Sequence, residues 1–136
     1  ALGRERAWVV HGSAPPHVVM DEISTIGPTA VLDLCGRERS RRTLDPGSMG
    51  VSPARLEELR GGDADANARL LLEILSGGGG RAARDIVRVN AAAALIVAGV
   101  ASGWDDAMER STASIDSGAA RRVLDAMRRV AGKPAA

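Results

Sequence analysis

The stretch that decides the fold lies in the second half of the chain, where residues 81–98 read RAARDIVRVNAAAALIVA. Its apolar residues recur at the spacing that places side chains on one face of a helix, namely Ile86, Val89, Ala93 and Val97. This periodicity predicts a helix from about Arg81 to Ala98. The signals on both sides of it are also helical.

Upstream of this stretch, Ser52-Pro53 is typical of a helix start and Gly61-Gly62 of a helix end. Asp63 is placed to cap a further helix, which Gly77–Gly80 would end. Both segments therefore predict helices.

Downstream, Ser102 and Asp105 have the three-residue spacing of a capping box, which predicts another helix start. Gly118 falls within the last helical stretch, where a glycine costs roughly 1 kcal/mol and is expected to interrupt the helix. Residues 51–132 are therefore expected to be helical, with roughly four helices.

The first half of the chain is predicted to be strand and loop. The apolar run Ala7–Val10 is typical of a buried strand, and Pro28–Cys35 alternates apolar side chains at period two. Arg37–Arg42 is expected to form a hairpin tip, after which Thr43-Leu44 returns as a second strand. The fold class is therefore α/β in a single domain, residues 1–136, with strands and loops over 1–50.

Composition excludes several classes of protein. The 136 residues hold 18 basic and 17 acidic side chains, so the net charge of +1 argues against a strongly basic nucleic-acid binder. The one cysteine, Cys35, excludes an internal disulfide framework.

The chain has 24 alanines, no Phe and no Tyr, so its core is thin. Either the helices pack closely or the chain is covered by a partner or by another part of itself.

No membrane or secretion signal is expected. The apolar run Ala91–Ala101 is far shorter than the ~20 residues that span a bilayer. The first six residues carry charge where the apolar segment of a signal peptide would lie. We therefore expect a cytoplasmic protein.

The candidate metal ligands are the adjacent carboxylates Asp21 and Glu22, which follow an apolar run. Mg²⁺ takes hard oxygen ligands and is commonly bound by one or two carboxylates together with phosphate and water. The alternative is a solvated loop. A zinc site that adds His11 and His17 fits no closed structural spacing.

Four other features have a functional and a structural interpretation. Gly77–Gly80 precedes a helix, as in a phosphate cradle, but lacks the strand before it and is more typical of a linker. Gly61-Gly62-Asp63 is better explained as the end of one helix and the cap of the next. The basic cluster Arg37–Arg42 has no aromatic neighbours on which bases could stack. Asn90 is either a hydrogen-bonded core amide, which we favour, or a site residue.

Several stretches in order together resemble the C-terminal part of anthranilate phosphoribosyltransferase. They cover nearly the whole chain and are Trp8–Gly12 (WVVHG), Asp21–Ser24 (DEIS) with Gly27–Thr29 (GPT), Gly61–Ala68 (GGDADANA), Arg84–Leu95 (RDIVRVNAAAAL) and Ile115–Gly118 (IDSG). The chain would then be the C-terminal part of the phosphoribosyltransferase/nucleoside phosphorylase α/β domain.

This resemblance implies transfer of the phosphoribosyl group from phosphoribosyl pyrophosphate to the amine of anthranilate, a step of tryptophan biosynthesis. It implies that Asp21 and Glu22 bind Mg²⁺ at the pyrophosphate of the donor. It also implies a homodimeric intact enzyme whose helical N-terminal domain packs on the α/β domain.

Two departures from the family pattern bear on activity. The upstream half is absent, and with it the glycine-rich pyrophosphate loop and the arginine that meets the anthranilate carboxylate. The link Ser13–Met20 is longer than the family's, contains two prolines and lacks its glycine. The 136 residues alone are therefore expected to be inactive.

Two alternatives stay open. A pyrimidine nucleoside phosphorylase of the same fold superfamily would use phosphate as the nucleophile, but the Gly61–Ala68 and Arg84–Leu95 stretches argue against it. A non-catalytic relative would bind nucleic acid or another protein, and the near-zero net charge weakens the nucleic-acid form.

Overall fold

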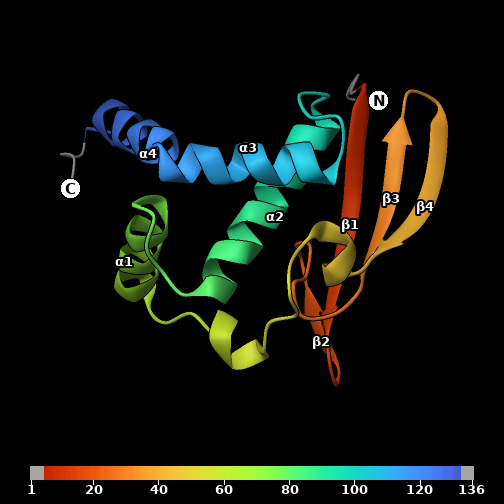
Figure 1. Cartoon of the computed structure of the whole chain (residues 1–136), viewed down its shortest axis with the longest axis horizontal. Coiled ribbons are helices and arrows are strands. Elements are labelled where there is room, and N and C mark those ends of the chain that lie inside the picture. The colour runs from red at the N-terminus through yellow and green to blue at the C-terminus, as the bar shows by residue number, and fades with distance from the viewer. Residues whose placement is uncertain (1–4, 133–136) are drawn as a thin grey trace.

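The computed structural model of the chain describes residues 5–132. A sheet lies at one end of the molecule, and the helices extend away from it (Figure 1). The sheet comes from the first half of the chain and the helices from the second, so the predicted α/β class is confirmed.

The sheet has four strands in the order β2-β1-β3-β4, and each neighbouring pair is antiparallel. The strands are β1 (Arg6–Ala14), β2 (Val18–Met20), β3 (Thr29–Cys35) and β4 (Glu38–Leu44). Val18–Met20 is too short to be assigned from sequence alone, and it is strand here because it pairs with the end of β1.

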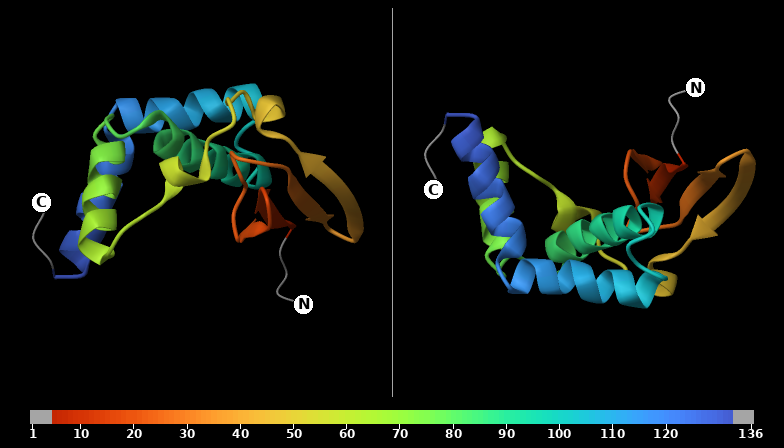
Figure 2. Two further views of the ribbon diagram at one scale, coloured as in Figure 1. Left: turned by 90° about the horizontal axis from the view of Figure 1, so that it is seen from below. Right: turned by 90° about the horizontal axis from the view of Figure 1, so that it is seen from above.

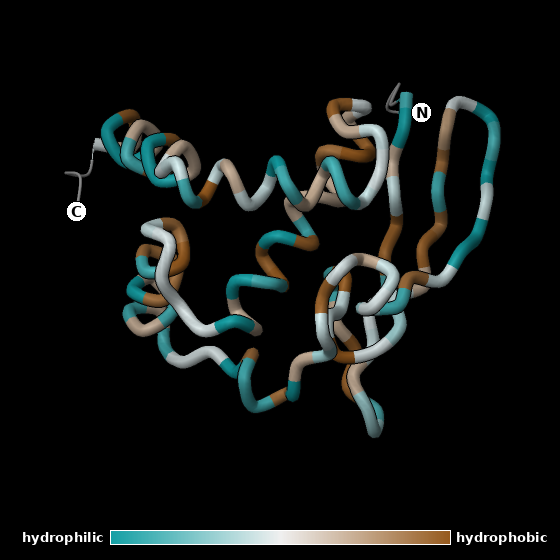
Figure 3. The backbone as a smooth tube through the Cα atoms, in the orientation of Figure 1, coloured by the Kyte–Doolittle hydropathy of each residue, from teal (hydrophilic) through white to brown (hydrophobic). Residues whose placement is uncertain are grey.

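The predicted hairpin tip at Arg37–Arg42 is wrong. The turn occupies only Gly36 and Arg37, and β4 already begins at Glu38. The side chains from Glu38 to Thr43 are all exposed, so β4 shows no apolar alternation and is hydrophilic along most of its length (Figure 3). Such a charged strand is typical of a sheet edge.

The structure has four helices over residues 51–132, as the sequence predicts, although the helix predicted after Ser52-Pro53 is replaced by a 3-10 turn and the last helical stretch is divided in two. They are α1 (Ala64–Leu75), α2 (Arg81–Val97), α3 (Trp104–Asp116) and α4 (Ala119–Val130), with short 3-10 turns η1 (Pro46–Met49) and η2 (Leu56–Leu59). α1 and α4 lie side by side at the end far from the sheet (Figure 2). Within residues 5–132, no helix is both long enough and apolar enough to cross a bilayer.

Two predicted helix boundaries are confirmed, and one predicted helix does not form. Asp63 caps α1 by accepting a hydrogen bond from the Ala66 amide at 2.8 Å, and Gly118, with a φ of 70°, separates α3 from α4. No full helix follows Ser52-Pro53, because the Ala54 amide donates to the Thr25 carbonyl and only η2 forms further on.

The capping box predicted at Ser102 and Asp105 is also wrong. The amide of Ser102 donates instead to the carboxylate of Asp106 at 3.0 Å. The helix begins later than predicted, with Gly103 as its N-cap, so the capping carboxylate lies one residue further along.

The core lies between the sheet and helices α2 and α3. Its buried members are Ile23, Val31, Leu44, Met49, Val51, Val89, Ala92, Ala93, Ala101, Ala107 and Met108. Val89, Ala92 and Ala107 are fully buried, and α2 contacts α3 more extensively than any other helix pair in the described residues. Small side chains let these two helices approach closely, which is how an alanine-rich chain still excludes water.

One ion-pair cluster ties the sheet together. Asp33 on β3 is 8% exposed and accepts hydrogen bonds from Arg6 at 2.7 and 3.2 Å and from Arg42 at 3.4 Å. The Arg42 guanidinium also lies 4.2 Å from the ring centroid of Trp8, which packs against Trp104. The cluster thus joins β1, β3 and β4 to the start of α3.

We expect Asp33→Asn to destabilise the fold by about 1–2 kcal/mol at pH 7, because two arginines lose a charged partner. Hydrogen bonding from Arg6 holds the pKa of Asp33 below its ordinary value. The stabilisation is therefore present above the ordinary aspartate pKa and is lost as pH falls through the lower folded-state pKa. Urea unfolding at pH 7 and pH 3 measures this, with the exposed Asp65→Asn as control. An equal cost at both pH values would contradict the prediction.

Candidate functional site

The acidic pair lies in the bend that directly follows β2. β2 returns along β1, so that Met20 pairs with Gly12, and the chain then turns through Asp21 and Glu22 toward β3. Asp21 is exposed and Glu22 is half-buried. Two chemically similar carboxylates thus sit in different environments.

The backbone of this bend passes directly against β1 at Gly12. Gly12 is buried, and a Cβ there would collide with the Glu22 carbonyl oxygen and lie 3.1 Å from the Ser24 side chain. Only glycine fits this approach. Sequence reasoning missed this role, although a glycine within a strand is a known sign of close backbone approach.

Hydrogen bonds on the sheet side then hold the segment after the bend. The Ser24 amide donates to Thr29 Oγ1 at 2.9 Å, and the Ser24 hydroxyl donates to the Ser13 carbonyl at 2.7 Å. The same hydroxyl accepts from the amides of Ile26 and Gly27. These bonds fix the chain that follows the acidic pair.

The two carboxylates carry uncompensated charge. Among the ion pairs within residues 5–132, none involves Asp21 or Glu22. Burial, and then the neighbouring charge of Asp21, raises the pKa of Glu22. A divalent cation would relieve both effects, so the donor set suits Mg²⁺, which takes hard oxygen ligands.

The two side chains line different depressions. Asp21 lines one of about 400 Å³ together with Val10, His11, Val19 and Met20. Glu22 lines one of about 190 Å³, whose other walls are Met20, Glu58, Leu59, Leu70, Ile74, Ala83, Ile86 and Val87. The acidic pair therefore stands at the boundary between the sheet and the helices.

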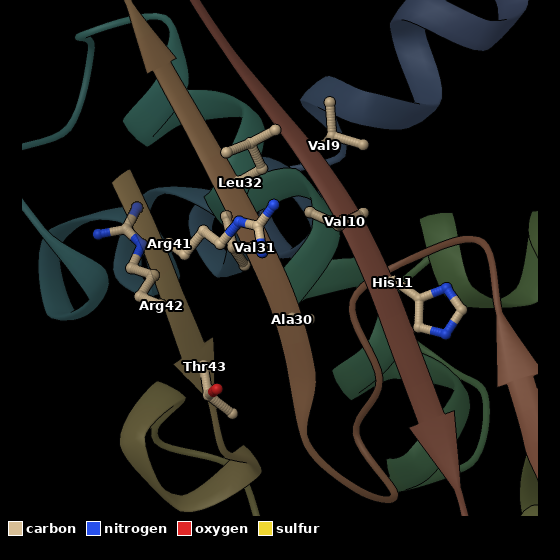
Figure 4. A pocket seen from close by; sticks show the side chains of 9 residues that line it. All are labelled: Val9, Val10, His11, Ala30, Val31, Leu32, Arg41, Arg42 and Thr43. Carbon is tan, nitrogen blue, oxygen red and sulfur yellow. The ribbon is translucent and has the colours of Figure 1, made fainter. Parts of the chain in front are cut away.

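A further depression of about 460 Å³ lies on the sheet (Figure 4). It is lined by Val9, Val10, His11, Ala30, Val31, Leu32, Arg41, Arg42 and Thr43. Val9 is 57% exposed, so this face of the sheet has no cover within the described residues. His11 lines both this depression and the one beside Asp21, and sequence reasoning gave no signal for that.

The alternative zinc site does not form. Within residues 5–132, no group of three or more His, Cys, Asp or Glu side chains could hold a metal ion. His17 lies in the turn between β1 and β2 and shares one depression with His11, whereas Asp21 lines a different one with His11.

The glycine-rich and basic segments have structural roles. Gly77–Gly80 forms a tight connection from α1 to α2, held by a 2.6 Å hydrogen bond from Arg84 to the Gly77 carbonyl. Gly79 has a φ of +83°, and a Cβ there would lie 2.9 Å from Ile74 Cγ1.

Gly61-Gly62 ends the segment before α1, where the Asn67 side chain holds the Gly62 backbone. The cluster Arg37–Arg42 lies mostly on the exposed edge strand β4.

Comparison with known proteins gives the family. The profile described as "Glycosyl transferase family, a/b domain" matches residues 1–121. The chain belongs to this family.

Named relatives and solved structures confirm the resemblance read from the sequence. The anthranilate phosphoribosyltransferase of Methylorubrum populi is 46% identical over 123 residues, which are 90% of this chain and 35% of that protein. Two structures of the Saccharomyces cerevisiae anthranilate phosphoribosyltransferase share the fold. The one in complex with 4-fluoroanthranilate has a TM-score of 0.77 at 28% identity, over 88% of this chain and 34% of the other. The one in complex with PRPP and Mg has a TM-score of 0.75 at 29% identity, over 86% and 32%.

These matches cover only part of each relative. The chain spans about a third of the length of the proteins it matches. Membership of the family is therefore a property of this chain, whereas activity and substrates belong to the longer relatives.

We expect Glu22→Gln to raise the melting temperature at pH 7. Burial raises the pKa of Glu22 in the folded state, so its charge costs stability, and this cost grows as pH rises from the ordinary glutamate pKa through the folded-state pKa. Glutamine removes the charge at similar size. The gain should become small near pH 4, where Glu22 of the unaltered protein is mostly protonated and therefore uncharged, like the glutamine of the variant. Thermal unfolding without divalent cations at the two pH values measures it, and a loss of stability at pH 7 would contradict it.

Proposed function

We propose that residues 1–136 form the C-terminal part of the α/β domain of an anthranilate phosphoribosyltransferase, with a strand and loop region over 1–50 and a helical region over 51–132. The intact enzyme would transfer the phosphoribosyl group from phosphoribosyl pyrophosphate to anthranilate in tryptophan biosynthesis. It would depend on Mg²⁺, for which we assign Asp21 and Glu22 as the protein ligands.

The observation that carries this proposal is the uncompensated acidic pair on a constrained bend. Neither carboxylate forms an ion pair in the described residues, and the backbone around them is held against Gly12 and by the bonds of Ser24. A fixed pair of unpaired negative charges costs folding free energy, which is typical of a binding site. The names of the relatives supply the substrates.

The chemistry gives each residue a role. Asp21 and Glu22 would hold Mg²⁺ at the pyrophosphate of the donor, where the metal would supply charge neutralisation to the leaving group. Asp21 and Glu22 contribute carboxylate oxygens, and phosphate oxygens and water would complete the coordination. The backbone contacts at Gly12 and Ser24 would limit how much of the bend has to be ordered when the donor binds.

The alternatives have less support. The relatives reported above carry the name anthranilate phosphoribosyltransferase, which disfavours a nucleoside phosphorylase. The net charge of +1 disfavours a nucleic-acid-binding relative. The homodimer expected for the intact enzyme stays a prediction.

The 136 residues alone should not form phosphoribosyl anthranilate at a measurable rate. They span about a third of the relatives' length, so groups that the longer relatives use to bind the donor would lie outside them. The assay follows loss of anthranilate fluorescence with Mg²⁺ and phosphoribosyl pyrophosphate present. Turnover near that of a full-length relative would contradict the prediction.

The metal assignment is tested in a chimera in which these residues replace the matching segment of a full-length relative. Asp21→Asn with Glu22→Gln keeps shape and removes both charges. We expect kcat/KM to fall by about 100-fold or more, the scale of several kcal/mol of metal stabilisation, and the response to Mg²⁺ to weaken. The variant should remain folded, with a melting temperature no lower than that of the unaltered chimera, and the KM for anthranilate should change little.

The matched control is Asp105→Asn with Glu109→Gln, which removes the same two charges from exposed positions on α3. It should leave the magnesium titration unchanged. If the Asp21/Glu22 double variant also gives an unaltered rate and magnesium curve, the assignment is wrong.

A further inference from the structure

The side chain of Asn90 reaches from the middle of α2 to the segment that carries the acidic pair. Its Oδ1 accepts a hydrogen bond from the Ile23 amide at 2.9 Å, and its Nδ2 donates to the Ile23 carbonyl at 3.1 Å. The same Nδ2 also donates to the Ile86 carbonyl at 2.9 Å, within α2. One amide thus occupies both backbone polar groups of Ile23 and is itself anchored to its own helix.

Ile23 follows Glu22 directly and is 1% exposed. Buried backbone groups need partners, and Asn90 supplies both for this residue. Without Asn90, the backbone next to Glu22 would have to move toward water or leave two buried groups unpaired. The direction of the chain at Glu22 therefore depends on a residue of α2.

The other constraints on this segment come from the opposite side. Thr29 and Ser13 hold Ser24 from the sheet, and Gly12 admits the Glu22 carbonyl against β1. Asn90 holds the segment from the helical layer. Ile86, one turn before Asn90, also lines the depression into which Glu22 opens. The acidic pair is therefore fixed between two layers, and Asn90 is the contact from the helix.

We propose that Asn90 is a positioning residue for the acidic pair: by binding the Ile23 backbone it sets the placement of the Asp21 and Glu22 carboxylates for a divalent cation. This inference rests on the function proposed above. Asn90 acts through the backbone and is not assigned as a metal ligand or a catalytic residue. A core role alone would stabilise the fold without affecting cation binding.

The test uses the whole 136-residue chain and Mn²⁺ alone as a paramagnetic probe of the cation site. In the unaltered chain, we expect Mn²⁺ to broaden the amide resonances of residues 21–23 first. In Asn90→Ala, the Mn²⁺ concentration that gives equal broadening should rise about tenfold or more, the loss expected when a supporting contact behind a metal ligand is removed. The Ile23 amide should also exchange faster with solvent.

The matched control is Asn67→Ala. Asn67 makes the same two-bond contact with one backbone residue, accepting from the Gly62 amide at 2.9 Å and donating to its carbonyl at 3.0 Å. This variant removes an equivalent pair of bonds away from the acidic pair, so its Mn²⁺ titration should match that of the unaltered chain. Should Asn90→Ala fail to fold, Asn90→Ser takes its place, because serine cannot make both bonds to Ile23.

The outcomes separate the two proposals. Equal broadening in the unaltered chain and the folded Asn90 variant overturns the positioning role and leaves the metal assignment intact. The absence of broadening at residues 21–23 in the unaltered chain overturns the metal assignment and the positioning role with it. Weakened broadening in both the Asn90 and Asn67 variants shows a general effect of lost stability and also overturns the inference.

Discussion

The close packing of α2 on its neighbours is the constraint on which the rest of the structure depends. Val89 and Ala92 are fully buried, and the alanines beside them leave little side chain between α2 and α3. A larger residue at Ala92 would force the two helices apart, because protein interiors have no spare volume. Since Asn90 lies between these two residues, the same packing sets how far its amide reaches.

This arrangement links the core to the candidate site. The side chain of Asn90 can bond to the Ile23 backbone only at the observed distance between α2 and the sheet, and the packing of Val89 and Ala92 sets that distance. Substitutions in the helix core would therefore shift the acidic bend through the hydrogen bonds between Asn90 and Ile23, without any contact with the carboxylates themselves.

Local sequence signals predicted most of the fold. Periodicity located α2, and Asp63 and Gly118 marked helix boundaries that the structure has. The failures have separate causes. β4 has no apolar alternation because both its faces are exposed, and the segment after Ser52-Pro53 stays extended because Ala54 bonds to Thr25. The first failure reflects a strand without an apolar face, and the second depends on a distant partner that local pattern does not contain.

For the proposed site, the sequence supplies only the chemical groups. Adjacent carboxylates can be seen in any sequence, and the family resemblance pointed to the same pair. The supports could not be found that way, since Asn90 lies 67 residues from Ile23 and the role of Gly12 depends on which backbone passes it. The different burial of Asp21 and Glu22 also follows from the helices that close over one of them.

The charged edge strand has a consequence for association between copies of the chain. A free edge strand is a template on which a second strand can add, and apolar edges of this kind lead to aggregation. β4 presents Arg39 and Arg41 on its exposed side, whereas Arg42 is paired with Asp33. A second copy that added its own β4 would bring these arginines against like charges, which opposes pairing. The strand that local pattern could not identify therefore limits growth of the sheet at this end.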